Sequence, residues 1–531
     1  MTEWIFVTGG VLSGLGKGLL SASVAKILQS RGLKVVPVKC DGYLNIDPGT
    51  MNPIEHGEVY VLEDGGEVDM DFGHYERFLN VNGRSSWNLT SGKIFKSVID
   101  RERRGDYLGQ TVQMIPHVTD EVKDRLRSAA EEEDADVVLV EIGGTVGDIE
   151  NQIFLEAVRQ LRSEEESVLI HLTLVPFLET VGEQKTKPTQ HSVKELQEAG
   201  LSPDIIVGRS SEELDSDTKE KIALFCDVEE RDVISNPDLE NVYRLPLKLS
   251  KEGIDDSIME KLGRKNIQAG ESLDRWKELV DSLDNPSDTV KIAICGKYTD
   301  IDDSYASIEE ALKHAGAHMD TRPEIRFVDT EGVESIDEAG ERLSDSDAVI
   351  IPGGFGSRGV RGKIEVARYC RENSKPLLGL CFGLQLMVVE YARNVCGLEG
   401  AHSTEIDEDT SHPVIDILPE QKEKEEKGGT MRLGSCPAYL NEGTKVRDLY
   451  GSKKVSERHR HRYEVNPEYH DMFSEDGLIV SGSSEEGRLV EFIELSGHPF
   501  YIGTQAHPEF NSSLETPNPL FKGLLEAGRE K

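Results

Sequence analysis

The 531-residue chain lacks the features of several large protein classes. Its seven cysteines are scattered and form no C-x-x-C pair, which argues against a zinc site and against a disulfide framework. No run of about 18 apolar residues predicts a membrane span. The N-terminus has no basic run followed by an apolar stretch, as a signal peptide would. We therefore expect a cytoplasmic protein with no membrane partner.

Basic residues are also scarce. Lysine and arginine number 60 against 99 aspartates and glutamates, which leaves a net charge of −39. This excess of acid argues against a nucleic-acid partner, because phosphates would be repelled over most of the surface. The short basic run at 458–462 is too small to reverse that expectation. One hypothesis is that the source lives in high salt, where screening removes the self-repulsion.

The chain is long enough for two to four domains, and its pattern indicates two α/β blocks joined by a polar linker. We place the first domain at 1–267, the linker at 268–289 and the second domain at 290–531. Apolar runs separated by helices predict a parallel sheet covered on both faces. Strands are expected at 4–7, 34–38, 136–141, 167–174 and 204–207, then at 290–294, 347–351, 376–380, 489–495 and 500–505. Helices are expected at 17–30, 273–283 and 384–393, and a solvated loop at 420–427.

A glycine-rich turn follows the first strand, at residues 8–18. Backbone N–H groups in such a turn cradle phosphates, and Lys17 supplies charge. It is an imperfect Walker A motif, because Val11 stands where the pattern has glycine and Gly18 where it has serine or threonine. The alternative is a plain βα turn.

Acids and cations are predicted near the same sheet edge. Glu141 ends an apolar strand, where a charge without a partner is costly and where a Walker-B-type acid belongs. Lys39 ends the second strand, and residues 185–192 form a basic loop in an acidic chain. Several phosphates bound in one cleft would explain these cations, and surface lysines are the alternative.

The second block contains a strand, a Gly-x-Cys-x-Gly turn and a helix, at residues 375–393. This is the thiol version of the nucleophile elbow, in which a tight turn exposes the sulfur and the helix N-terminus favours thiolate. The alternative is a small apolar residue in a turn. Cys381 is the predicted nucleophile.

His507 and Glu509 are the predicted partners of Cys381. Pro508 should hold His507 extended, so that residues i and i+2 point the same way. His507 would act as general base and Glu509 would orient its ring. The oxyanion hole would use backbone N–H groups near Gly354 and of Phe382. The alternative is a surface His-Pro-Glu turn.

These motifs also occur together, in order, in one enzyme family. Residues 13–18, 45–51, 73–78, 141–150, 185–192, 352–356, 429–434, 458–464 and 507–510, with the Cys381 elbow, resemble CTP synthase. That family makes CTP from UTP, ATP and glutamine. The resemblance implies a P-loop amidoligase domain similar to dethiobiotin synthetase, followed by a class I glutamine amidotransferase domain, both doubly wound. ATP would phosphorylate O4 of UTP, and ammonia from glutamine would displace the phosphate after crossing a shielded passage.

The resemblance also implies which residues bind each ligand. ATP would contact Ser13, Gly14, Leu15, Gly16, Lys17, Gly18, Leu19, Asp71 and Leu239, with Asp71 and Glu141 holding Mg²⁺. UTP, or CTP as feedback inhibitor, would contact Ser13, Asp148, Ile149, Glu150, Lys185, Thr186, Lys187, Pro188, Thr189, Gln190 and Lys221. Glutamine would contact Gly354, Phe382, Gly383, Leu384, Gln385, Glu405 and Arg462. GTP is the expected allosteric activator, near Arg432, and a homotetramer the expected assembly.

One departure from the family and three alternative functions remain. Gly42 stands where the family often has proline, which loosens the turn beside Lys39. A cobyric-acid-type amidoligase is disfavoured by the 185–192 loop and the 141–150 run. A partitioning ATPase would carry a signature lysine at position 12, which is Leu12. A nucleotide-gated filament with an inactive glutaminase is disfavoured by the intact Cys381, His507 and Glu509.

Overall fold

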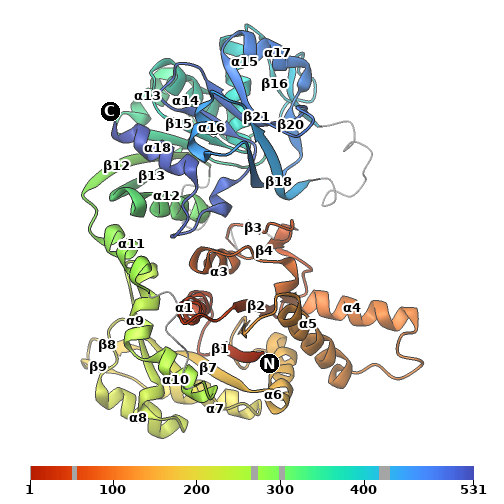
Figure 1. The fold of residues 1–531 in the computed structure, drawn as a ribbon, viewed down its shortest axis with the longest axis vertical. Coiled ribbons are helices and arrows are strands. Elements are labelled where there is room, and N and C mark those ends of the chain that lie inside the picture. The colour runs from red at the N-terminus through yellow and green to blue at the C-terminus, as the bar shows by residue number, and fades with distance from the viewer. Residues whose placement is uncertain (1, 51–56, 265–272, 298–304, 418–430, 531) are drawn as a thin grey trace. The chain divides into compact units, whose positions relative to one another are not determined.

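The protein is described by a computed structural model that covers residues 2–50, 57–264, 273–297, 305–417 and 431–530 (Figure 1). It forms two compact units. The first contains Met1–Pro48 and His74–Val280, and the second contains Gly49–Gly73 and Asp281–Lys531. Residues 49–73 therefore pack with the C-terminal part of the chain. The predicted loop at 420–427 and the start of the predicted linker lie outside the described residues.

The first unit is built on a seven-stranded, entirely parallel sheet. The strand order is β11 (Val233–Pro237), β10 (Ile205–Ser210), β7 (Ser167–Leu174), β1 (Glu3–Gly9), β6 (Val137–Ile142), β2 (Val35–Asp41) and β5 (Asn88–Thr90). Most of these strands are buried along their whole length, as apolar runs covered on both faces require. The predicted parallel sheet is confirmed.

Helices cover that sheet, and the period of two along β1 decides which side chains meet them. Ile5 and Val7 share a core cluster with α1 (Lys17–Ser30), α9 (Leu245–Lys251) and α10 (Ile254–Lys261). The other helices of this part of the chain are α3 (Asp71–Leu79), α4 (Ser91–Arg104), α5 (Thr119–Glu132), α6 (Gln152–Glu164), α7 (Lys187–Glu198), α8 (Ser216–Cys226) and α11 (Asp274–Asp284). The glycine-rich turn at residues 8–18, called the P-loop below, lies between β1 and α1 and therefore joins two buried elements.

The second unit is built on a nine-stranded mixed sheet. Its parallel half is β13 (Thr321–Asp329), β12 (Asp288–Gly296), β14 (Ala348–Ile351), β15 (Leu377–Leu380) and β23 (Tyr501–Thr504). The sheet continues antiparallel through β22 (Val490–Leu495), β21 (Leu478–Ser483), β18 (Arg432–Leu440) and β19 (Lys454–His461). The parallel half matches the predicted doubly wound pattern, and β13, β18, β19 and β21 are additional to the predicted strands.

Two core clusters lie on the two faces of this sheet, as β15 shows. Leu377 belongs to one cluster, with α13 (Ile336–Leu343), α14 (Val360–Glu372) and α15 (Phe382–Asn394). Leu378 and Leu380 belong to the other, with α12 (Ala306–Met319) and α18 (Pro519–Arg529). The remaining helices are the short α16 (Lys445–Tyr450) and α17 (His470–Glu475). The loop after β15 is thus held from both sides.

Residues 49–73 contribute a short hairpin, β3 (Tyr60–Val61) and β4 (Glu67–Val68), to the second unit. Arg458 of β19 is 1% exposed, and its guanidinium donates to the Val61 carbonyl over 3.1 Å. The Tyr60 hydroxyl donates to the Phe510 carbonyl over 3.0 Å, and the two rings lie 4.8 Å apart. The hairpin is therefore part of the hydrophobic and polar core around residue 510.

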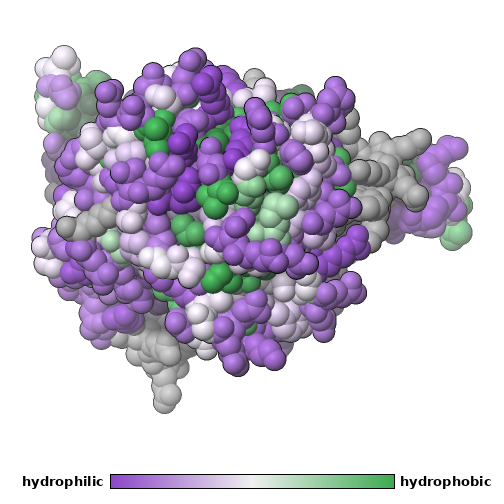
Figure 2. Space-filling model, turned by 90° about the horizontal axis from the view of Figure 1, so that it is seen from above, coloured by the Kyte–Doolittle hydropathy of each residue, from purple (hydrophilic) through white to green (hydrophobic). Residues whose placement is uncertain are grey.

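The surface agrees with the acidic composition. Figure 2 shows one face that is mostly hydrophilic, with hydrophobic side chains gathered in a few separate groups. Among the described residues, no helix combines the length and the apolar character that crossing a membrane requires.

Candidate active sites

Cys381 occupies the elbow between β15 and α15. It caps the N-terminus of α15 with φ 50° and ψ −103°, a conformation that a non-glycine residue adopts at a cost and that is typical of functional sites. Its backbone N–H donates to the Thr504 carbonyl of β23 over 2.7 Å. This pairing fixes the thiol at the carboxyl edge of the sheet.

His507 and Glu509 lie together beside this elbow. The Nδ1 of His507 lies 2.7 Å from Oε1 of Glu509, and the carboxylate oxygen accepts the hydrogen bond. The reason we gave for their meeting is wrong: Pro508–Asn511 forms a 3₁₀ turn, and His507 has ψ 76°. The turn, and not an extended chain, places both side chains on one side. The backbone N–H of His507 is also held, by the Arg458 carbonyl at 2.7 Å.

The charge state of His507 follows from its neighbours. Burial lowers its pKa, but the Glu509 carboxylate and a hydrogen bond with the Cys381 side chain outweigh burial and raise the pKa well above 6.5. An imidazolium that faces the thiol favours thiolate. The three side chains can therefore act as thiolate nucleophile, proton donor and orienting carboxylate.

Gly353 gives His507 the room that it needs. A Cβ at Gly353 would lie 2.9 Å from Cε1 of His507 and 3.7 Å from the Cβ of Cys381. Any side chain there would push the imidazole away from the thiol. Gly353, the first glycine after β14, is thus required by close packing against His507.

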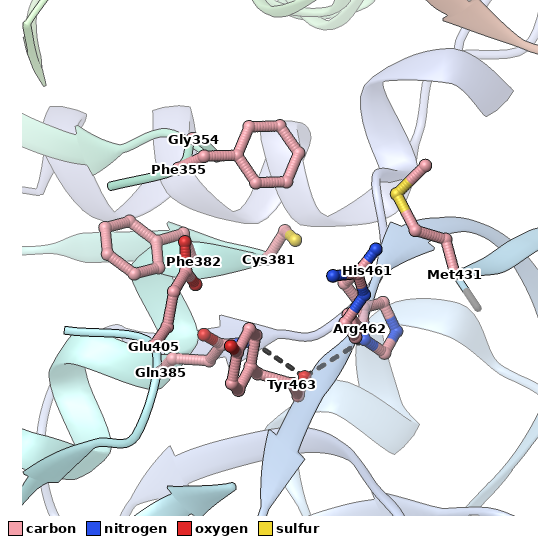
Figure 3. A pocket seen from close by; sticks show the side chains of 10 residues that line it. All are labelled: Gly354, Phe355, Cys381, Phe382, Gln385, Glu405, Met431, His461, Arg462 and Tyr463. Atoms are coloured by element: carbon pink, nitrogen blue, oxygen red, sulfur yellow. Dashed lines mark hydrogen bonds between the residues drawn. The ribbon is translucent and has the colours of Figure 1, made fainter. Parts of the chain in front are cut away.

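A cavity of about 220 Å³ opens on one side of Cys381. Figure 3 shows Gly354, Phe355 and Phe382 around the thiol and Arg462 across the cavity. Oε1 of Glu405 accepts the Gly356 N–H at 3.1 Å, and burial raises the pKa of Glu405 despite that hydrogen bond and nearby Lys297 and Arg462. An acid and a guanidinium in one cavity suit the two charged groups of an amino acid.

Of the residues predicted to contact glutamine, most line this cavity. They are Gly354, Phe382, Gln385, Glu405 and Arg462. Gly383 and Leu384 are buried in the first turn of α15 and are not among its lining residues. Gln385 points its amide at the Tyr463 carbonyl over 2.9 Å.

A second cavity, of about 310 Å³, also has Cys381 in its lining. Its lining includes Gly49, Glu58, Val59, Cys381, His507 and Glu509. The Oε2 of Glu58 accepts the Ser307 N–H at 3.0 Å. Gly49, Glu58 and Val59 therefore form part of the wall of a cavity that also contains Cys381.

In the first unit, the P-loop surrounds Lys17. The Lys17 ammonium donates to the Gly144 carbonyl over 2.6 Å, and the loop enters α1 through Gly16 at φ 95°. Val11, which replaces the Walker A glycine, has φ 77°, so the loop keeps a left-handed residue there although its side chain is β-branched. Ser13 and Gly14 are exposed, while Leu19 and Leu239 pack against the core below them.

Glu141 lies on β6 next to Lys39 of β2 in the register of the sheet. It is 2% exposed, and the Tyr75 hydroxyl of α3 donates to its Oε2. Asp71 is the first residue of that helix. Among the described residues no cluster of three or more His, Cys, Asp or Glu could hold a metal ion. A single buried carboxylate still fits Mg²⁺, which takes one or two carboxylates plus phosphate oxygens and waters.

Most of the residues predicted for UTP fall in two segments, 148–150 and 185–190, while Ser13 lies between β1 and α1 and Lys221 lies on α8. Asp148 caps its own loop by accepting the Thr145 N–H at 3.0 Å, and Ile149 is 75% exposed beside Glu150. Lys185 pairs with Glu183 over 2.6 Å, and the side chain of Lys221 lies close enough to influence the same acid. The others form the start of α7, namely Thr186, Lys187, Pro188, Thr189 and Gln190, where Lys187 donates to Gln190 over 3.0 Å.

Gly42 turns out to be a close packing position. A Cβ there would lie 2.5 Å from Oδ1 of Asn151 and 2.8 Å from Cβ of Glu150. The turn beside Lys39 is therefore held against the Asp148–Glu150 loop.

Sequence reasoning missed His171 of β7, whose two ring nitrogens are both bonded. Nδ1 is 2.9 Å from the Thr8 hydroxyl and Nε2 is 2.7 Å from the Ser192 hydroxyl of α7. Burial, and then Lys17, lower its pKa to about 3, so the ring is neutral. In the sequence it is a lone histidine in an apolar strand, and nothing there indicates that it bonds to Thr8 of β1 and Ser192 of α7.

Comparison with known proteins explains why both units occur in one chain. Residues 3–264 match the family described as CTP synthase N-terminus, and residues 300–527 match glutamine amidotransferase class-I. The chain belongs to the CTP synthase family. A CTP synthase of Archaeoglobus fulgidus is 54% identical over 528 residues, covering 99% of this chain and 98% of that protein. A CTP synthase of Bacillus subtilis is 52% identical, covering 100% and 99%. CTP synthases this similar over the full length indicate the same two-domain architecture.

Proposed function

We propose that this protein carries out glutamine-dependent conversion of UTP to CTP in pyrimidine biosynthesis, with Cys381, His507 and Glu509 as its glutaminase triad. The overall reaction follows from membership of the CTP synthase family. The observation that supports the triad is the 2.7 Å contact between His507 and Glu509, beside a thiol held in the elbow conformation.

In this proposal the second unit releases ammonia. The Cys381 thiolate attacks the side-chain amide carbon of glutamine, and the oxyanion is held by backbone N–H groups near Gly354 and of Phe382. The C–N bond breaks as His507 gives its proton to the leaving nitrogen, and water then hydrolyses the thioester. Glu405 and Arg462 suit the α-ammonium and α-carboxylate of the substrate.

The first unit uses that ammonia. ATP is the co-substrate, and we propose that it transfers its γ-phosphoryl group to O4 of UTP, after which ammonia displaces phosphate. In this proposal Lys17 and Lys39 neutralise the transferring charge. When bound, Mg²⁺ would supply further neutralisation of the phosphates, with Asp71 and Glu141 as its proposed ligands. A neutral His171 would hold Thr8 and Ser192, and thus the ATP and UTP loops, in register.

We further propose that ammonia leaves Cys381 through the second cavity. The two cavities share Gly354, Phe355 and Cys381, so one receives glutamine while the other opens from the same sulfur. Val59 and Phe510 give the second cavity apolar walls, which help keep ammonia unprotonated. Glu58 lies at its wall and is engaged by the backbone of Ser307.

Inhibition by CTP, activation by GTP, a homotetramer and a cytoplasmic location stay predictions from the resemblance. For GTP the structure adds one constraint. Arg432 points inward, where it pairs with Glu491 over 2.6 Å and lies 3.6 Å from Glu464. A nucleotide near this residue would therefore meet an arginine that is already neutralised.

Replacing the nucleophile tests this proposal. Cys381→Ala should abolish glutamine-dependent CTP formation and leave ammonia-dependent formation intact, because only the source of nitrogen is removed. The assay compares both nitrogen sources with UTP, ATP and Mg²⁺, and Cys295→Ala, which removes a buried thiol outside the triad, is the control. Loss of both reactions in Cys381→Ala would contradict separate sites.

A further inference from the structure

One buried lysine of the second unit has no role in the mechanism given above. Lys363 of α14 is 2% exposed. Its Nζ lies 4.0 Å from the position that a Cβ on Gly354 would occupy, and 5.6 Å from the ring centroid of Phe382. Gly354 and Phe382 are the two residues assigned to the oxyanion hole. The Lys363 ammonium therefore lies close to both residues of the proposed oxyanion hole.

This ammonium is not neutralised by an acid. Within the described part of the chain, no carboxylate forms an ion pair with Lys363, and the titratable groups that face it are the Cys295 thiol of β12 and Lys297. Burial, and then Lys297, lower the pKa of Lys363 to about 8. A buried charge without a counter-charge costs folding free energy. Packing alone would be served better by an apolar side chain of the same length.

The loop next to this lysine is held by a second cation. Lys297 donates to the Phe355 carbonyl, while Glu405 accepts the Gly356 N–H at 3.1 Å. The turn at 353–356 is thus bonded by Lys297 at one carbonyl and by Glu405 at one N–H, and Lys363 lies next to Gly354. These contacts restrain the conformation of the turn.

We propose that Lys363 is a positioning residue for glutamine hydrolysis, which fixes the Gly354 turn and places a positive charge behind the oxyanion hole. The inference rests on the proposed glutaminase function. When the thiolate attacks, a C–S bond forms and the π electrons of the amide move to its oxygen. That oxygen becomes negative, and a positive charge held nearby in a site with little water stabilises it.

The test compares two substitutions at 363 with a matched control in the full-length protein. Lys363→Met keeps the length of the stem but loses the charge, and Lys363→Arg keeps the charge. The control, Lys375→Met, removes another buried lysine, whose ammonium donates to the Leu343 carbonyl over 2.9 Å. Lys375 precedes β15, and Cys381 follows the other end of that strand. For each variant the glutamine-dependent and ammonia-dependent rates, the pH profile and the Tm are measured.

Lys363→Met should lower kcat with glutamine at least about tenfold, leave the ammonia-dependent rate within about twofold, and not lower Tm. The wild-type glutamine-dependent rate should fall as the pH rises through about 8, where Lys363 loses its proton. That fall should be absent in Lys363→Met and move to higher pH in Lys363→Arg, which should recover part of kcat. Lys375→Met should keep the wild-type profile.

Two results would overturn the inference. One is a Lys363→Met enzyme with the wild-type kcat and pH profile. The other is an equal loss of activity in both 363 variants together with a lowered Tm, which would show that Lys363 only packs. Failure of the proposed function looks different, because Cys381→Ala would then retain glutamine-dependent CTP formation.

Discussion

At the scale of the residue, Glu509 decides how His507 titrates. The carboxylate and the Cys381 thiol raise the pKa of His507 well above 6.5 although burial opposes them. Glu509→Gln keeps the shape of the side chain and removes its charge. By analogy with the orienting acid of serine proteases, we expect a loss of about 10²- to 10⁴-fold in glutamine-dependent kcat. The ammonia-dependent rate measures the integrity of the first unit and should not change.

The same variant should change how stability depends on pH. A histidine whose folded pKa is raised binds its proton more tightly in the folded state. Its contribution to the free energy of unfolding is therefore complete below 6.5 and is lost as the pH rises through the raised pKa. The Tm of the wild type should decline over that interval relative to the Tm of Glu509→Gln. Parallel Tm curves for the two proteins would contradict the assignment.

Sequence alone identified the residues whose signals are short-range. Cys381 follows from the glycines on either side of it, and His507 with Glu509 from a three-residue pattern. Lys363 and His171 could not be found in this way, because the residues around each of them in the sequence carry no signal of a site. A lysine in an amphipathic helix and a histidine in an apolar strand are ordinary in sequence, and only packing places them at Gly354 and Thr8.

At the scale of the element, the β3–β4 hairpin belongs to the glutaminase unit although it comes early in the chain. Tyr60 is 1% exposed, and its ring packs on Phe510. Phe510 in turn stacks on His507, with ring centroids 5.4 Å apart and an interplanar angle of 20°. The hairpin thus supports His507, the proposed catalytic histidine, through one intervening ring.

Tyr60→Ala should therefore damage glutamine hydrolysis. Loss of a buried aromatic side chain costs about 3–5 kcal/mol, and we expect a lower Tm for the C-terminal unit and a lower kcat with glutamine. Tyr60→Phe keeps the ring and loses the hydrogen bond to the Phe510 carbonyl, worth about 1 kcal/mol, together with the 3.4 Å hydrogen bond that the hydroxyl accepts from Arg458. Calorimetry and both nitrogen assays measure these effects. The control is Tyr243→Ala, because Tyr243 is an equally buried tyrosine of the first unit. It should spare the glutaminase. Equal losses of glutamine-dependent kcat in the two alanine variants would argue against the proposed role of Tyr60.

Elements were predictable where the apolar pattern is continuous. Helix 17–30 and strand 167–174 have the bounds that we predicted. Each is a largely buried run with a glycine or charged residues at its ends. The pairing of β18 with β19 was not predicted, since the two strands are separated by residues 441–453, which contain α16. The placement of residues 49–73 was missed for a similar reason: the buried Arg458 that anchors Val61 lies 397 residues away.

At the scale of the whole molecule, the net charge of −39 is the dominant long-range term. Acids outnumber bases 99 to 60, so many carboxylates have no basic partner even though the surface is rich in ion pairs such as Arg231 with Glu260 at 2.7 Å. Like charges in excess destabilise the compact state. Exposed ion pairs contribute little, about 0–1 kcal/mol each. Salt should therefore remove more repulsion than attraction.

We accordingly predict that Tm rises as KCl is raised from about 0.1 M, where the Debye length is about 10 Å, to molar concentrations, where it is about 3 Å. Thermal unfolding in a KCl series measures the effect. Sucrose at matched osmolality serves as the control, because it strengthens burial without screening charge. If KCl and sucrose raise Tm equally, the effect is preferential exclusion and not screening. If Tm is the same at low and molar salt, the excess acid has no stability role, and adaptation to a saline interior loses its physical basis.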